Sequence, residues 1–366
     1  MRFRVTCHEG FEAFCADELG SLGATVEEKG KGSVTLGGPF ELIYILNRFG
    51  RTFDRVLVQI ASCSLSEADV VDELLSACDF GLLGHVSGVT LDADEFVTRV
   101  RSRWITQLSS FLPRAFGARG GRRRAQGRSD AYLYLCVEGE TASLYADTTG
   151  DSLNIREYRV YNHPSSIRPT LAASLLLMAK PKGGVLYDPF CGGGTILIEA
   201  AQMSKSRPTH IKRDYRYRGF LDFDPVAEEA AAPAKPVIPG FTSILGSEIN
   251  SVHLKGCGRN LESAGVRDVS VVLGDCTETV LPNKADVIVT NPPFGVRGAK
   301  LNRMALLYAR FVDNLPNLLK DGGRAVVVTS DFEELKRLLG RKGMRQEGAA
   351  RTLHGHLWVE GVAFTR

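Results

Sequence analysis

The sharpest chemical signal in the sequence is a turn, Asn291-Pro292-Pro293-Phe294, which follows the apolar run Asp286–Thr290. Two prolines fix φ and remove backbone donors, so the turn is rigid and presents carbonyl oxygens and an asparagine side chain without partners. Such a turn suits the acceptance of hydrogen bonds from a planar –NH2 group, and Phe294 can stack on the ring that carries it. The alternative is a proline-terminated strand with Phe294 in the core, which is less in keeping with a central strand that points into a ligand crevice.

Three carboxylates follow other apolar runs in the same half of the chain. Asp188 opens a turn with three successive glycines that leads into a helix, and Glu248 and Asp275 end the next two runs. Glycines let a ligand approach the backbone, and open α/β sheets bind ligands at the carboxyl ends of their strands. Each carboxylate alone is an ordinary strand end or helix cap, but the three together predict a ligand crevice, with Glu248 placed to accept hydrogen bonds from ribose hydroxyls. The turn lacks the Lys-Ser/Thr ending of a P-loop, which argues against an NTPase.

A sheet must bring these residues together, and the second half of the chain alternates strands and helices as that requires. Nearly all-apolar strands are typical of a parallel sheet covered by helices on both faces. The expected strands are Gly184–Tyr187, Thr242–Ser247, Val269–Leu273, Asp286–Thr290 and Arg324–Thr329. The expected helices are Ile196–Met203, Val252–Ser263, Met304–Leu319 and Phe332–Leu339, and Gln346–Leu353 with His356–Phe364 forms a closing antiparallel pair.

The first 150 residues have an α+β pattern instead. We expect one small domain over residues 1–62 and a second over residues 63–150, followed by a linker over residues 151–170 and the α/β domain over residues 171–366. Residues 204–240 interrupt the later alternation with charges, aromatic residues and prolines. They are interpreted as an insertion between the first two strands.

The net charge of +3 conceals an uneven distribution. Residues 1–98 hold 7 basic and 16 acidic side chains, whereas residues 99–128 hold nine arginines and no acidic residue. Such a segment suits phosphate contacts and predicts binding with a steep salt dependence, although a solvated loop is the alternative. The residues expected to bind RNA there are Arg119, Arg122, Arg123, Arg124 and Arg128.

A second basic cluster lies in the insertion. Its aromatic residues Tyr215, Tyr217 and Phe220 are expected beside the crevice, where their rings could stack on exposed bases. A solvated loop is again the alternative. The charged residues expected to bind RNA here are Lys212, Arg213, Arg216 and Arg218.

Composition excludes several classes of protein. A chain of 366 residues with 44% hydrophobic residues can bury two or three cores, which argues against disorder. No apolar run approaches the roughly 18 residues of a membrane helix, and the N-terminus lacks the apolar core of a signal peptide. The eight cysteines form no C-x-x-C pair, so we expect no metal site. The expectation is a cytoplasmic monomer without membrane association.

Together these motifs resemble the class I S-adenosylmethionine-dependent methyltransferases that act on exocyclic amines. Asp188–Ala201 and Asn291–Gly295 are similar, more specifically, to the THUMP-containing RNA guanine-N2 methyltransferases, and Gly150–Arg159 and His163–Ala173 resemble that family's join between RNA-binding and catalytic domains. Thr6–Glu12 and the region around Leu46–Thr52 fit its N-terminal part. The resemblance implies an α/β protein: a Rossmann-like methyltransferase domain with a mostly parallel seven-stranded sheet, preceded by ferredoxin-like and THUMP domains.

The resemblance also implies a site for S-adenosylmethionine, which the reaction converts to S-adenosylhomocysteine. Its ribose would lie near Glu248 and its adenine near Asp275 and Cys276. Ser165-Ser166-Ile167 departs from the family's usual Ala-Pro-Leu. The other implied cofactor-binding residues are Asp188, Cys191, Gly192, Gly194, Thr195, Asn291, Arg168 and Thr170.

The implied activity is methylation of guanine N2 in tRNA, at the sixth nucleotide in the acceptor stem. Asn291 Oδ1 and the Pro292 carbonyl would accept both amine hydrogens and aim the nitrogen at the methyl group, while Phe294 stacks on the flipped-out base. Methylation of 23S rRNA guanine N2 is the alternative within the class. DNA adenine or protein glutamine methylation, and an RNA-binding protein with an inactive domain, are the alternatives outside it. The arginine-rich N-terminal module favours RNA over DNA or protein.

Overall fold

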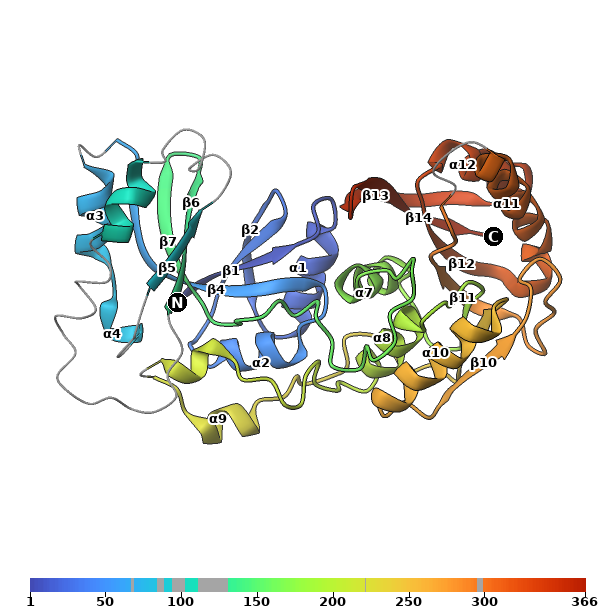
Figure 1. The fold of residues 1–366 in the computed structure, drawn as a ribbon, viewed down its shortest axis with the longest axis horizontal. Coiled ribbons are helices and arrows are strands. Elements are labelled where there is room, and N and C mark those ends of the chain that lie inside the picture. Colours follow the sequence, from blue (N-terminus) through green and yellow to red (C-terminus); the bar gives the residue numbers. More distant parts are fainter. Residues whose placement is uncertain (67–68, 84–88, 94–102, 111–130, 221, 295–298) are drawn as a thin grey trace.

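The computed structural model describes residues 1–66, 69–83, 89–93, 103–110, 131–220, 222–294 and 299–366. These residues form an elongated molecule built on two sheets, one from each half of the chain (Figure 1). The five arginines expected to bind RNA between Arg119 and Arg128 lie outside the described residues.

The N-terminal half forms one continuous seven-stranded sheet in the order β2-β3-β1-β4-β7-β6-β5. Its strands are β1 (Arg2–Cys7), β2 (Thr25–Gly30), β3 (Ser33–Gly37), β4 (Phe53–Ser64), β5 (Val89–Ala93), β6 (Ala131–Glu138) and β7 (Thr141–Asp147). Its helices are α1 (Glu12–Ser21), α2 (Leu42–Phe49), α3 (Val70–Ala77) and α4 (Phe80–Leu83), and residues 103–110 are also helical.

The long strand β4 joins the two parts of this sheet. Its first residues pair with β1, where Phe3 lies opposite Val58, and its last residues pair with β7, where Ser64 lies opposite Thr141. The expected boundary between the first two domains, after residue 62, therefore falls within β4.

The C-terminal half forms the second seven-stranded sheet, in the order β10-β9-β8-β11-β12-β14-β13. Strands β10, β9, β8, β11 and β12 are parallel and β14 is antiparallel, which confirms the expected mostly parallel sheet. The strands are β8 (Val185–Asp188), β9 (Ser243–Glu248), β10 (Val269–Leu273), β11 (Ala285–Thr290), β12 (Leu319–Thr329), β13 (Arg345–His354) and β14 (Leu357–Thr365). The helices are α7 (Pro169–Met178), α8 (Thr195–Met203), α10 (Ser251–Ser263), α11 (Ala299–Leu318) and α12 (Phe332–Arg341).

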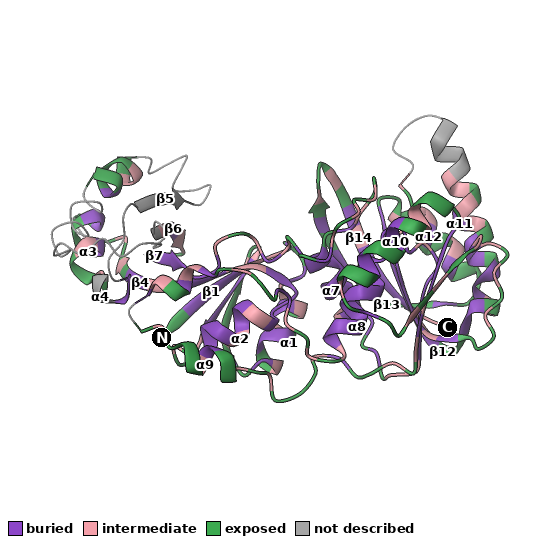
Figure 2. Ribbon diagram, turned by 60° about the horizontal axis from the view of Figure 1, so that its bottom comes forward, coloured by how far each residue is buried: buried purple, intermediate pink, exposed green. Residues whose placement is uncertain are grey.

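Helices cover both faces of this sheet. Successive strand residues point to opposite sides, so neighbouring residues of one strand pack against different helices. Leu186 packs in a core with α7, α8 and α10, whereas its neighbour Tyr187 packs with α11 and α12. Figure 2 shows the buried strands together with α10 and α12, whose outer faces are exposed, whereas α7 and α8 are buried along almost their whole length. The near-absence of polar residues in these strands follows from this double burial.

The insertion over residues 204–240 packs against the N-terminal domain and contains η1 (Arg216–Gly219) and α9 (Pro225–Ala230). The Tyr215 hydroxyl donates to the Asn47 carbonyl at 3.0 Å, and the Tyr217 ring lies edge-on to Tyr44 at 5.3 Å. Tyr215, Tyr217 and Phe220 belong to the N-terminal core, with relative exposures of 3%, 0% and 9%. The expectation that these rings stack on bases is therefore wrong: they join the insertion to the N-terminal domain.

Candidate functional site

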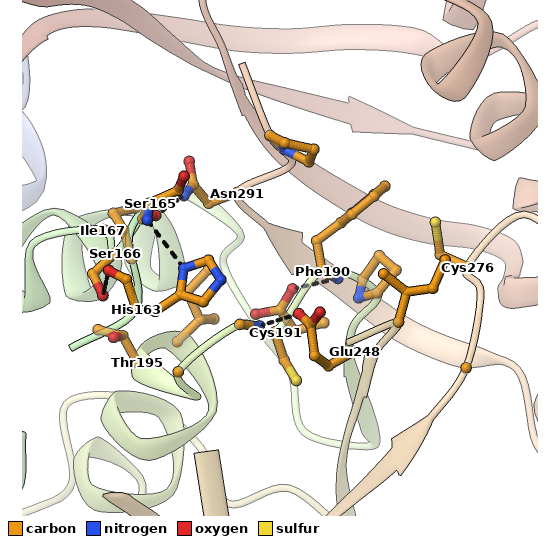
Figure 3. Close-up of a pocket in the computed structure, with 18 of the residues that line it drawn as sticks. His163, Ser165, Ser166, Ile167, Phe190, Cys191, Thr195, Glu248, Cys276 and Asn291 are labelled. Carbon is orange, nitrogen blue, oxygen red and sulfur yellow. Dashed lines mark hydrogen bonds between the residues drawn. The ribbon is translucent and has the colours of Figure 1, made fainter. Parts of the chain in front are cut away.

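A pocket of about 930 Å³, open to solvent, lies at the carboxyl ends of β8, β9, β10 and β11 (Figure 3). Ligands of open α/β sheets bind in the crevice outside the carboxyl ends of the strands, so the position of this pocket suits a cofactor. Of the residues expected to bind the cofactor, those lining the pocket are Asp188, Cys191, Gly192, Thr195, Glu248, Asp275, Cys276 and Asn291.

The glycine turn after β8 forms the floor of this pocket. Gly192 and Gly194 have φ values of +53° and +81°, which side-chain-bearing residues rarely adopt. A Cβ atom on Gly194 would also lie 2.7 Å from Cys257 Sγ on α10. Gly194 thus acts by shaping the turn before α8, without lining the pocket itself. A hydrogen bond with Cys257, together with burial, raises the pKa of Cys191, so its thiol is not a reactive nucleophile.

Glu248, at the end of β9, supports the same turn. Its Oε2 accepts the Gly192 N–H at 3.2 Å and its Oε1 accepts the Asn250 N–H at 2.9 Å. Each carboxylate oxygen retains lone-pair capacity for a further donor. The carboxylate is therefore positioned at the pocket wall with its orientation fixed.

Asp188, at the end of β8, lines the pocket and is almost fully buried. Its Oδ1 accepts the Thr290 hydroxyl at 2.6 Å and the Phe190 N–H at 3.1 Å. Burial, with a further contribution from the charge of Glu248, raises the pKa of Asp188 to about 7 despite these hydrogen bonds. A cationic ligand would favour its ionised form.

Asp275 and Cys276 line the wall beyond β10. Asp275 Oδ1 accepts both the N–H and the hydroxyl of Thr277 at 2.8 Å. Asn314 on α11 donates to the Cys276 carbonyl at 2.9 Å. These contacts fix the loop that follows β10.

The turn after β11 places Asn291 at the rim of the pocket. Asn291 Nδ2 donates to the Ser165 carbonyl at 3.3 Å, while Oδ1 is buried and has no hydrogen-bond partner among the residues that the structure describes. The side chain is held by its nitrogen and leaves an acceptor available. The Pro293 carbonyl accepts the Tyr308 hydroxyl at 3.3 Å. Pro292 is buried and does not line the pocket, and Phe294 is half-buried against the core of the α7 and α8 face.

Sequence reasoning missed His163, which lines the pocket beside the glycine turn that Glu248 supports (Figure 3). Its Nδ1 accepts the Ser165 N–H at 3.1 Å, and its ring meets His253 edge-on at 4.3 Å. Burial and the neighbouring His253 lower the pKa of His163, so the neutral ring carries its proton on Nε2. His163 lies in the linker, where the strand pattern gives no signal. Leu307 of α11 and the linker residues Ser165, Ser166 and Ile167 also line the pocket.

Arg168 and Thr170, also expected at the cofactor, lie outside the pocket lining. Thr170 is buried at the start of α7, where its hydroxyl contacts His8 Nε2 at 3.1 Å and Asp54 Oδ1 at 3.2 Å. Arg168 is the exposed residue before this helix. The start of α7 therefore faces the N-terminal domain.

The basic side chains of the insertion make contacts within the protein. Arg216 pairs with Asp147 at 3.4 Å and Arg218 with Glu228 at 2.8 Å. Arg213 donates to backbone carbonyls, and Lys212 is exposed. Their role in RNA binding stays a prediction.

No helix in the described part of the chain is long and apolar enough to cross a membrane. Within the same ranges, no three His, Cys, Asp or Glu side chains gather as a metal site.

Comparison with protein families gives two matches. Residues 156–360 match the model of the RMKL-like methyltransferase domain, and residues 2–57 match the RlmL ferredoxin-like domain. The second match agrees with the ferredoxin-like start expected from the sequence.

Two archaeal relatives align over most of this chain. The tRNA (guanine(6)-N2)-methyltransferase of Archaeoglobus fulgidus is 30% identical over 344 residues, which cover 90% of this chain and 83% of the relative. The enzyme of the same name from Methanocaldococcus jannaschii is 26% identical, with 98% of each chain covered. The ribosomal RNA large subunit methyltransferase K/L of Syntrophotalea carbinolica is 27% identical over 92% of this chain, which spans only 50% of that protein.

Solved structures share the fold over the whole length. TrmN from Thermus thermophilus has a TM-score of 0.71 and 22% identity, covering 100% of this chain and 99% of that one. A structure complexed with SAH has a TM-score of 0.78 and 19% identity, covering 99% and 97%.

Proposed function

The chain belongs to the RMKL-like methyltransferase family, and from this membership we propose that it methylates guanine N2 in tRNA, at position 6 of the acceptor stem, with S-adenosylmethionine as donor. The observation that carries the proposal is the buried, unpartnered Asn291 Oδ1 at the pocket rim. A buried acceptor without a partner is unfavourable unless a ligand satisfies it.

The residues of the pocket fit the proposed donor. Glu248 and Asp275 offer acceptors for hydroxyl and amine groups, and the glycine turn lets a ligand approach the backbone. Asp188, buried with a pKa of about 7, suits a neighbouring positive charge. S-adenosylmethionine, when bound, supplies an electrophilic methyl group on a sulfonium sulfur.

The chain's own contribution is to position the amine. The guanine N2 lone pair is delocalised into the ring, so the amine is a poor nucleophile. Asn291 Oδ1 would accept one N–H of this amine, which draws electron density onto the nitrogen and fixes its direction. Asn291 Nδ2 is already bound to the Ser165 carbonyl, so the side chain is oriented before the base arrives.

The N-terminal half supplies the RNA contacts in this proposal. We assign residues 1–62 to a ferredoxin-like domain and residues 63–150 to a THUMP RNA-binding domain, the two sharing β4 within one continuous sheet. Residues 151–170 are the linker before the methyltransferase domain. The names of the two archaeal relatives support tRNA as the substrate, and both align over most of this chain. The enzyme would act as a monomer in the cytoplasm.

Labelling of unmodified tRNA transcripts with a radioactive methyl donor, followed by mapping of the labelled nucleotide, tests the proposal. We expect label on N2 of guanine 6. Label on another tRNA guanine would contradict the position alone. Label on a large-subunit rRNA fragment, on DNA adenine or on a glutamine-containing peptide, with none on tRNA, would contradict the substrate.

A further inference from the structure

A second cavity lies where the insertion meets the end of α2. It encloses about 740 Å³ including open solvent, and Arg48, His210 and Arg213 line it together with Tyr215 and Arg218. The other lining residues are Pro208, Ile211, Pro225, Glu228 and Glu229. The proposed methyl transfer uses none of these residues.

His210 is the unusual residue of this cavity. Its side chain is 4% exposed, yet neither ring nitrogen has a hydrogen-bond partner within the described ranges. Buried polar groups in native proteins are nearly always satisfied, so this ring calls for a ligand or a water in the cavity that it lines. Burial and the charge of Arg213 lower the pKa of His210 to about 3, so the ring is neutral and carries one N–H donor.

Two guanidinium groups in the same cavity lack a carboxylate partner in the part of the chain described. Arg48 Nη1 donates to the carbonyls of Glu228 and Ala231, and Arg213 donates to the carbonyls of Asp151 and Ile155 at 2.9 and 2.8 Å. Carbonyl groups satisfy the N–H donors but do not neutralise the charge. Burial lowers the pKa of Arg213, which marks its charge as incompletely compensated.

The acidic residues of the cavity are accounted for in part. Glu228 accepts the Arg218 guanidinium through Nε and Nη2 at 3.0 and 2.8 Å, so this pair is neutral. Glu229 is exposed at the rim. Glu157, close enough to raise the pKa of Arg213, accepts the backbone N–H groups of Ile211 and Lys212. The lining residues Arg48, Arg213 and Arg218 carry three positive charges against the two carboxylates of Glu228 and Glu229, so the lining keeps one positive charge next to the buried His210 ring. Asp151 also lies close enough to raise the pKa of Arg213, but its carboxylate is not among the groups that line the cavity.

We propose that this cavity binds a phosphate group of the RNA backbone, with Arg48 and Arg213 supplying charge and His210 supplying a hydrogen bond. Guanidinium groups suit phosphate because their N–H donors match its oxygens in geometry and charge. The RNA identity of the ligand rests on the proposed function, whereas the phosphate chemistry does not. The cavity adjoins Arg51 and Arg156, which bind Glu199 on α8, and the first residues of α8 line the cofactor pocket. A phosphate here would therefore anchor RNA beside residues that contact α8, the helix that begins at that pocket.

The first experiment measures binding of unmodified tRNA transcripts as a function of salt. The logarithm of the binding constant falls linearly with the logarithm of the salt concentration. Removing one phosphate-binding charge makes this negative slope shallower by about 0.7–0.9. We expect Arg48→Gln to show that change and to weaken binding about tenfold at 0.15 M salt, while S-adenosylhomocysteine affinity stays unchanged. Arg48→Lys should keep the slope. Arg337→Gln, on exposed α12, is the matched control and should bind as the wild type does.

The second experiment separates the sources of phosphate and is independent of the reaction. Inorganic phosphate is titrated into the full chain while the ring resonances of His210, assigned with His210→Gln, are followed by NMR. We expect a saturable shift that Arg48→Gln weakens. A shift with an unchanged tRNA slope would mean a site for free phosphate and would overturn the RNA assignment. No shift and no slope change would mean a water-filled cavity and would overturn the site.

Failure of the two proposals can be told apart. If wild-type protein methylates tRNA while Arg48→Gln keeps the full salt slope, this inference is wrong and the proposed function stands. If wild-type protein methylates no tRNA but the His210 resonances shift with phosphate, the proposed function is wrong and the phosphate site stands.

Discussion

Arg51 Nη1 donates to Glu199 Oε2 at 2.8 Å, and both side chains are buried where the two halves of the molecule meet. Arg51 follows α2 in the N-terminal domain, and Glu199 lies on the pocket helix α8. Arg156 Nε and the Tyr158 hydroxyl, both in the linker, donate to Glu199 Oε1 at 3.0 and 2.9 Å. One carboxylate thus ties the N-terminal domain and the linker to the helix that begins at the cofactor pocket.

Replacement of Glu199 by Gln should unfold the protein more easily, because two buried guanidinium groups lose their counter-charge. Breaking a buried pair from one side costs about 3–5 kcal/mol, and urea unfolding at pH 7 measures the loss. Burial raises the pKa of Glu199, but Arg156 and Arg51 lower it further, to about 2. The contribution to stability is therefore present above the ordinary value of 4.5 and is lost as the pH falls toward 2.

A surface pair provides the matched control for Glu199. Glu334 and Arg337 on α12 are partly exposed and pair at 2.5 Å. Glu334→Gln should cost less than about 1 kcal/mol, because exposed ion pairs contribute little. Equal losses in the two variants would contradict the role assigned to the buried carboxylate.

Asp188 should make donor binding depend on pH. With a pKa raised to about 7, mainly by burial, the side chain is largely protonated at pH 6 and ionised at pH 8 in the free protein. A cationic ligand favours the carboxylate, so S-adenosylmethionine affinity should rise over this range and binding should release protons. Calorimetry in buffers of different ionisation enthalpy measures that release.

S-adenosylhomocysteine lacks the sulfonium charge and is the matched ligand for Asp188. Its affinity should change less between pH 6 and pH 8. Asp188→Asn should remove the difference between the two ligands. Parallel pH profiles for both ligands in the wild type would show that Asp188 does not sense the charge.

The pocket at the carboxyl ends of the strands was predictable, because the sheet topology alone brings its residues together. In a parallel sheet every strand end lies at one edge, so Asp188, Glu248, Asp275 and Asn291 meet whatever the details of packing. His163 was not predictable in this way, because it reaches the pocket from the linker and no strand register fixes its place. The same holds for Leu307, which enters from α11.

The insertion shows why a local pattern is insufficient. Tyr217 alternates with basic residues, as in a loop that binds single-stranded RNA, yet it is buried against Tyr44 from α2, a helix far earlier in the chain. That partner is invisible in the local sequence, since only the fold places the insertion on the N-terminal domain. The alternation of charged and aromatic residues is therefore compatible both with an RNA-binding loop and with a contact between parts of the protein. Only the long-range packing shows which of the two is present.

Tyr217→Ala should consequently destabilise the protein without a direct effect on base stacking. Removing a large buried aromatic side chain costs about 3–5 kcal/mol, measurable by urea unfolding. Ile211→Ala is the control within the insertion, because Ile211 is 86% exposed and should change stability little. A Tyr217 variant of full stability with weakened RNA binding would restore the stacking interpretation.

Replacement of Arg122, Arg123 and Arg124 by Ala tests the sequence-based assignment of the arginine segment, which lies outside the described residues. Each arginine that binds a phosphate should account for about 0.7–0.9 of the salt slope of tRNA binding. The decrease would therefore reach roughly 2–3 if all three arginines bind phosphates. An unchanged slope, measured by filter binding, would mean that these arginines face solvent.

Asn291→Ala should slow methyl transfer severely and leave donor binding intact. Oδ1 is the unpartnered acceptor after β11, while Asp188, Glu248 and the glycine turn line the pocket at the ends of β8 and β9. Removing one preorganised hydrogen-bonding group from a reacting centre lowers kcat by about 10²–10³. Single-turnover assays on saturating tRNA measure the rate, and calorimetry measures S-adenosylhomocysteine affinity. Ser165 offers a control, because it meets Asn291 only through its backbone carbonyl, so Ser165→Ala should retain near-normal turnover. Loss of donor affinity with normal turnover in Asn291→Ala would place the side chain in donor binding and leave the amine without its acceptor.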